Sequence, residues 1–115
     1  MPEDKRAYKR FVTYLEAHGK LPDGKTFTCE IINITPQGLA LKTTHILEIG
    51  EKLVLEIILI GFMGGERITF ECQVVRTEHI ALESSFKIGV KILEGSASDH
   101  MILYQFYAKK MREGR

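Results

Sequence analysis

Apolar and polar residues alternate over long parts of this chain, and turn-forming residues separate the alternating segments. The most regular alternation covers residues 68–74, and two others cover residues 53–59 and 86–92. A period of two residues predicts β-strands with one buried face. The apolar residues that alternate along one face of these three segments are Leu53, Leu55, Ile57, Leu59, Ile68, Phe70, Cys72, Val74, Phe86, Ile88, Val90 and Ile92.

Three more strands are predicted in the first half of the chain, at residues 11–17, 26–35 and 39–41. The segment 26–35 is rich in β-branched and aromatic residues, which favour strands. Turns are expected at residues 19–24, which contain Pro-Asp-Gly, and at residues 61–65, which contain Gly-Gly. Short strands separated by such turns are typical of a small antiparallel barrel.

After residue 96 the apolar period changes to that of a helix. Ser96 and Asp99 have the spacing of a capping box. Four residues then follow at helical spacing, and we expect them to cover one mouth of the barrel: Met101, Tyr104, Ala108 and Met111. The predicted fold class is therefore mainly β, a six-stranded antiparallel β-barrel with a C-terminal α-helix.

Strict alternation fails at Ile31 and Ile32, which are both apolar and come directly before Asn33. A β-bulge at this point would re-aim the side chains that follow it. A strand that is covered on both faces would give the same pattern.

The length of 115 residues predicts one domain with its own core. Residues 1–10 are charged and lack an apolar period, so we expect a flexible arm before a domain at residues 11–115. The net charge of +1 and the mixture of Lys and Glu on the strands argue against DNA or RNA as partners. The absence of an apolar signal-peptide core and of a segment long enough to span a membrane predicts a cytoplasmic protein.

The residues that most often perform chemistry are scattered. Cys29 and Cys72 lie inside predicted strands and do not form a CxxC pair, so we expect buried, reduced thiols. The four histidines have no partner at metal-ligand spacing, and no nucleophile–base pair is recognisable. The sequence therefore predicts no metal site, no cofactor and no enzymatic activity.

Two short motifs near the start of the chain suggest a binding function. Arg6 and Arg10 are separated by three residues, and the segment 33–38 reads Asn-Ile-Thr-Pro-Gln-Gly. Arginine suits phosphate recognition and also stacks on flat rings. Asn and Thr supply short polar groups, and Gly permits close backbone approach. Each motif alone is common by chance.

In this order and context, the two motifs resemble the RxxxR and [D/N]xSxxG signature of PilZ domains, bacterial receptors for cyclic di-GMP. The segment 87–91 is similar to a late Ile-Gly-Val element of the family, and residues 72–76 resemble its fifth-strand segment. The resemblance extends from Arg6 into the helix. Thr35 stands where Ser is usual, Asn33 replaces the commoner Asp, and Pro36 is unusual.

The resemblance implies a PilZ-type barrel that binds cyclic di-GMP and passes the signal to an unidentified protein partner. Arg6 and Arg10 would grip phosphates and stack on guanines, and Lys5 adds a cation that favours a stacked ligand dimer. Asn33 would bind a guanine edge, Thr35 would contact phosphate or guanine, and Gly38 would admit the ligand close to the backbone. The alternative is a PilZ-like protein-interaction module that does not bind the nucleotide.

Overall fold

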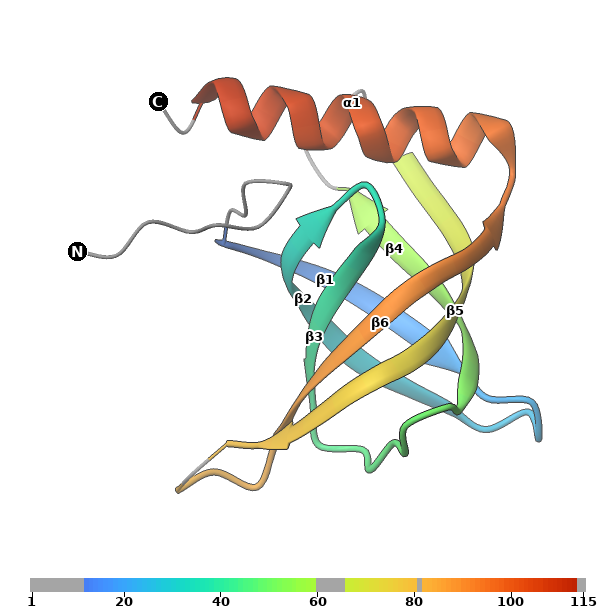
Figure 1. Cartoon of the computed structure of the whole chain (residues 1–115), viewed down its shortest axis with the longest axis vertical. Coiled ribbons are helices and arrows are strands. Elements are labelled where there is room, and N and C mark those ends of the chain that lie inside the picture. Colours follow the sequence, from blue (N-terminus) through green and yellow to red (C-terminus); the bar gives the residue numbers. More distant parts are fainter. Residues whose placement is uncertain (1–11, 60–65, 81, 114–115) are drawn as a thin grey trace.

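The computed structural model describes residues 12–59, 66–80 and 82–113, and within them six strands and one helix. Every strand pairs antiparallel with its neighbours, and the strands close a barrel in the order β1-β2-β3-β6-β5-β4 (Figure 1). The elements are β1 (Val12–Lys20), β2 (Thr26–Thr35), β3 (Gly38–Thr43), β4 (Lys52–Leu59), β5 (Glu66–His79), β6 (Phe86–Gly95) and α1 (Ala97–Glu113). The predicted six-stranded barrel with a C-terminal helix is confirmed.

The alternation in the sequence corresponds to the inside and the outside of the barrel. The four alternating apolar positions of 53–59 and the four of 68–74 are all buried, and the residues between them, which include Val54 and Ile58, are half-buried or exposed. Cys29 and Cys72 are buried, free thiols, as expected. Burial raises the pKa of both thiols to about 12, because a thiolate is poorly solvated in the core.

Strand ends differ from the prediction where polar residues continue a strand beyond its apolar part. β1 reaches Lys20 and β5 reaches His79, both several residues beyond the predicted ends. The Pro-Asp-Gly turn follows β1, and Gly24 adopts a φ of 92°, a conformation that favours glycine. The predicted arm at 1–10 and the predicted turn at 61–65 lie outside the described residues.

The helix packs on the barrel with a face that overlaps the predicted one only near its end, where Met111 is half-buried against the core. Leu103, Phe106 and Tyr107 are buried, whereas Met101 and Tyr104 are each 58% exposed. The predicted burial of Met101 and Tyr104 is therefore wrong. None of the described helices is long and apolar enough to cross a membrane.

Contacts at the start of α1 hold its first turn in place. The backbone amide of Asp99 donates to Oγ of Ser96 at 2.9 Å, which caps the helix. The Asp99 carboxylate does not return to Ser96 as in a capping box. It accepts instead from the backbone amide of Thr69 in β5 at 3.0 Å. This bond ties the first turn of α1 to the barrel, and sequence spacing alone cannot indicate it.

Candidate functional site

A β-bulge in β2 turns the second motif toward the outside of the barrel. Ile31 pairs with Leu41 and Asn33 pairs with Ala40, so Ile32 is the extra residue. Ile31 and Ile34 are fully buried, while Asn33 is half-buried. Without the bulge, Asn33 would follow Cys29 and Ile31 into the core. The bulge, one of the two explanations for the Ile-Ile doublet, is confirmed.

A second bulge in β5 does the same for an arginine. Val74 pairs with Val90 and Arg76 pairs with Gly89, which leaves Val75 as the extra residue. Val74 is buried and Arg76 is exposed, although both would face inward if strict alternation continued from Cys72. The bulge therefore directs the Arg76 guanidinium to the outer surface.

The two re-aimed side chains stand at the ends of one row across four neighbouring strands. Asn33 in β2 is opposite Ala40 in β3, Ala40 is opposite Gly89 in β6, and Gly89 is opposite Arg76 in β5. Three strand spacings separate the ends, a distance of about 14 Å along the sheet. Only Ala and Gly lie between them, so the floor of the row carries no large side chain.

A hollow of about 190 Å³ lies over this row. Its lining contains the Asn, the Thr and the Gly of the second motif together with the arginine of β5. The lining residues are Asn33, Thr35, Gly38, Leu39, Ala40, Val75, Arg76, Gly89 and Val90.

The Thr35 hydroxyl closes the turn between β2 and β3. Its oxygen accepts from the backbone amides of Gln37 at 3.3 Å and Gly38 at 3.2 Å, and the hydroxyl donates to the carbonyl oxygen of Gly38 at 3.3 Å. Ser could make the same bonds, which explains why either hydroxyl residue fits this position. The structure thus shows a role for Thr35 in shaping the turn.

The two glycines of the hollow serve different purposes. A Cβ added to Gly38 would lie 2.6 Å from the carbonyl oxygen of Val90, so β3 and β6 can pair there only because Gly38 has no side chain. A Cβ added to Gly89 would lie 3.5 Å from Cβ and 3.6 Å from Nε of Arg76, an ordinary contact distance. The Arg76 side chain therefore lies over Gly89.

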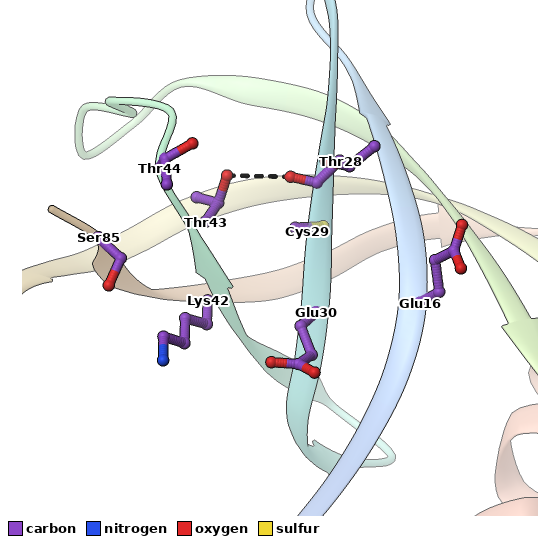
Figure 2. Close-up of a pocket in the computed structure, with 8 residues that line it drawn as sticks. All are labelled: Glu16, Thr28, Cys29, Glu30, Lys42, Thr43, Thr44 and Ser85. Atoms are coloured by element: carbon purple, nitrogen blue, oxygen red, sulfur yellow. Dashed lines mark hydrogen bonds between the residues drawn. The ribbon is translucent and has the colours of Figure 1, made fainter. Parts of the chain in front are cut away.

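A larger hollow of about 650 Å³ lies on another part of the barrel wall and is lined by β1, β2 and β3 with Thr44 and Ser85 (Figure 2). Glu16 and Glu30 lie opposite each other there, and Glu30 lies opposite Lys42. Lys42 Nζ contacts a carboxylate oxygen of Glu83 at 2.9 Å, and the hydrogen bond from Lys42 lowers the pKa of Glu83. Because its cation is paired and two carboxylates line it, this hollow suits an anion poorly.

The structure brings together three of the six site residues predicted from the sequence: Asn33, Thr35 and Gly38. Lys5, Arg6 and Arg10 lie outside the described residues, so their part in the site stays a prediction. Arg76 was not among the predicted site residues. The doublet Val74-Val75 before it interrupts the alternation as the Ile doublet before Asn33 does, but Ile57-Ile58 in β4 is a similar doublet whose pairing with β5 contains no bulge.

The family model described as "PilZ domain" matches residues 4–109, which include both motifs, the whole barrel and most of α1. No sequence among the curated proteins is similar enough to count as a match.

Several solved structures share the fold. Bacillus subtilis inhibitor of motility (MotI/DgrA) superposes with a TM-score of 0.83 at 22% identity, over 98% of this chain and 54% of that one. The PilZ domain of Escherichia coli YcgR with c-di-GMP gives 0.73 at 17% identity, over 97% and 95%. The MrkH–c-di-GMP complex from K. pneumonia gives 0.77 at 20% identity, over 97% and 55%. This chain therefore spans about half the length of the inhibitor of motility and of MrkH.

Proposed function

Because the chain belongs to the PilZ domain family, we propose that it binds cyclic di-GMP and acts as a signalling receptor or adaptor. Two proteins with the same fold, YcgR and MrkH, have been solved with c-di-GMP. At sequence identities near 20%, these structures show only that the fold is shared, so we infer the ligand from the chemistry of the site.

The observation that carries the proposal is the row from Asn33 to Arg76. Cyclic di-GMP carries two phosphates and two flat guanines. Arg76 offers a cationic fork for a phosphate or a flat face for a guanine. Asn33 offers a donor and an acceptor for a guanine edge. The small residues between them, Ala40 and Gly89, leave room for a flat ring to approach the sheet.

The arginine motif would complete this site. We propose that Arg6 and Arg10 bind the phosphates and stack on guanines, and that Lys5 adds a positive charge next to Arg6. Gly38 would admit the ligand close to the backbone. The Thr35 hydroxyl already makes hydrogen bonds within the turn, so its main contribution would be to hold the turn in a binding shape.

Two finer proposals concern the bound state. Four cations in residues 5–10, with Arg76 as a further one, favour a stacked dimer of the ligand, because a dimer carries about twice the phosphate charge. Closure of residues 1–10 over the row would also create a new surface for a downstream protein in the cytoplasm. Ligand should then slow tryptic cleavage after Arg6 and Arg10.

Isothermal titration with cyclic di-GMP tests the proposal, with GTP and cyclic GMP as controls. We expect heat only with cyclic di-GMP, a stoichiometry of two per chain for the stacked dimer, and no turnover of the ligand. One ligand per chain would reject the dimer and keep the receptor. No heat and no thermal shift at saturating ligand would reject the receptor, because a ligand that binds only the folded state must stabilise it. The protein-interaction module would then be the better explanation.

A further inference from the structure

Beside the row that forms the floor of the smaller hollow, a second row crosses the same outer face of the barrel. It consists of Gln73 in β5, Lys91 in β6 and Gly38 in β3, which lie opposite one another in that order. Lys91 comes two residues after Gly89 on β6, so the two positions share a face and their Cα atoms lie about 6.6 Å apart. Lys91 therefore stands at the edge of the hollow, although it is not among the residues that line it.

The backbone of Lys91 lies close to the hollow, and its side chain is exposed. The Lys91 Cα is 3.6 Å from the point where a Cβ of Gly38 would stand, and Gly38 lines the hollow. Within the described part of the chain, neither Lys91 nor Arg76 forms an ion pair. Both cations are therefore available to a ligand on this face.

Arg76 and Lys91 can reach the same place. The Arg76 side chain lies over Gly89, with Nη2 3.8 Å from the point where a Cβ of Gly89 would stand. A group held there by the guanidinium lies about 6.6 Å along the strand from the Lys91 Cα, which the flexible four-carbon stem of a lysine can span. Arginine binds phosphate through a rigid fork, and lysine adds a point charge. The pair therefore suits a phosphate above Gly89.

Lys87 offers a comparison, because it lies at the same distance from Gly89 on the other side. Its cross-strand neighbours are Glu78 in β5 and Lys42 in β3, and the Lys42 ammonium contacts the Glu83 carboxylate at 2.9 Å. Carboxylates on this side of the hollow therefore offset its cations.

The cross-strand neighbours of Lys91 are uncharged. One is Gly38, and the other is Gln73, whose side-chain amide donates to a backbone carbonyl oxygen of the loop between β3 and β4. The next acidic residues along β5 and β6, Glu71 and Glu94, lie opposite each other beyond this row. An anion is therefore favoured on the Lys91 side of the hollow.

We propose that Lys91 is a ligand-binding residue that contacts the phosphate which Arg76 holds over Gly89. The inference rests on the proposed function, because cyclic di-GMP supplies the phosphate. It also orients the ligand, since a phosphate between Arg76 and Lys91 leaves a guanine for Asn33 at the other end of the row.

Titration calorimetry of the full chain with cyclic di-GMP tests the proposal, with Lys87→Gln as the matched control for Lys91→Gln. Each variant removes one positive charge from the outer face of β6, at the same distance from Gly89. We expect Lys91→Gln to weaken binding roughly three- to tenfold, as for a partly exposed charged contact, and Lys87→Gln to stay within about twofold of the parent. Lys91→Arg, which keeps the charge, should retain binding. Both glutamine variants should unfold near the parent urea midpoint, because neither lysine belongs to the core.

The outcomes separate this inference from the proposed function. A parent chain that gives no heat with cyclic di-GMP would overturn both. A parent that binds, with Lys91→Gln binding equally well, would overturn the role of Lys91 and leave the receptor function intact. Equal losses in Lys91→Gln and Lys87→Gln would also overturn it, because the overall charge of the face would then explain the effect.

Discussion

Gly38 and Gly89 lie in the same hollow, but we predict different effects of alanine at the two positions. Gly38→Ala should lower the stability of the fold, whereas Gly89→Ala should weaken ligand binding and leave the stability unchanged. A methyl group at Gly38 would meet the carbonyl oxygen of Val90 at 2.6 Å, well inside van der Waals contact. The obstacle is backbone, so relief requires β3 to move away from β6 at the point where Gly38 pairs with Lys91. Overpacking of this kind costs about 1–3 kcal/mol of unfolding free energy.

Gly89→Ala is the matched control. Its methyl group would meet the flexible Arg76 side chain at 3.5 Å, so the free energy of unfolding should change by less than about 0.5 kcal/mol. The methyl group would nevertheless raise the floor beneath Arg76. We therefore expect Gly89→Ala to weaken cyclic di-GMP binding several-fold while it spares the fold.

Urea unfolding and thermal melts of the ligand-free variants measure the difference. For a domain of this size, the predicted cost at Gly38 lowers the melting temperature by roughly 4–15 °C. Gly38→Ala with the parent midpoint would refute the close-approach argument. Gly89→Ala with parent stability and parent affinity would show that the ligand does not lie on the row.

Three further predictions concern individual side chains. Arg76→Ala should weaken cyclic di-GMP binding in titration calorimetry by about 1.5–3 kcal/mol, as should Arg6→Ala or Arg10→Ala. Arg67→Ala is the control: Arg67 is on the same strand as Arg76 but outside the hollow, so this variant should bind as the parent does. Thr35→Val should lower the unfolding free energy by about 1–2 kcal/mol because it removes the hydroxyl from the turn, and Thr35→Ser should not; equal urea midpoints would contradict this. Burial raises the pKa of Cys72 to about 12, so the folded state holds its proton above the ordinary thiol pKa. Its contribution to stability is therefore complete below the ordinary thiol pKa of 9.0 and decreases as the pH rises from there toward about 12. Urea midpoints that do not fall between pH 8 and 10.5 would contradict the shift.

The sequence by itself determined the barrel and the family. Alternation such as Leu53-Leu55-Ile57 depends only on which face of a strand is apolar, and this property is local. The turn at Pro22-Asp23-Gly24 and the cap at Ser96 are also local, because their hydrogen bonds join residues within a few positions. The two motifs were recognisable for the same reason, since their order and spacing are visible along the chain.

Only the tertiary structure decided which residues form the row. Asn33 in β2 and Arg76 in β5 line the same hollow because β3 and β6 pair between these two strands. Each of β2 and β5 also contains a bulge that turns the side chain outward. The pairing of strands that are distant in the sequence depends on closure of the barrel. The residue pattern within one strand does not indicate which other strand it pairs with. The Ile and Val doublets indicated that alternation breaks, but the register shows where each following side chain points.

The helix illustrates the same limit. Its two apolar sides are both readable as periodic positions in the sequence. The choice between them depends on which side fits the barrel, and the hydrogen bond from the backbone amide of Thr69 to the Asp99 carboxylate, thirty residues away, holds the first turn there. The burial of Leu103 and Phe106 against the barrel, with this hydrogen bond holding the first turn, leaves Met101 and Tyr104 on the outside.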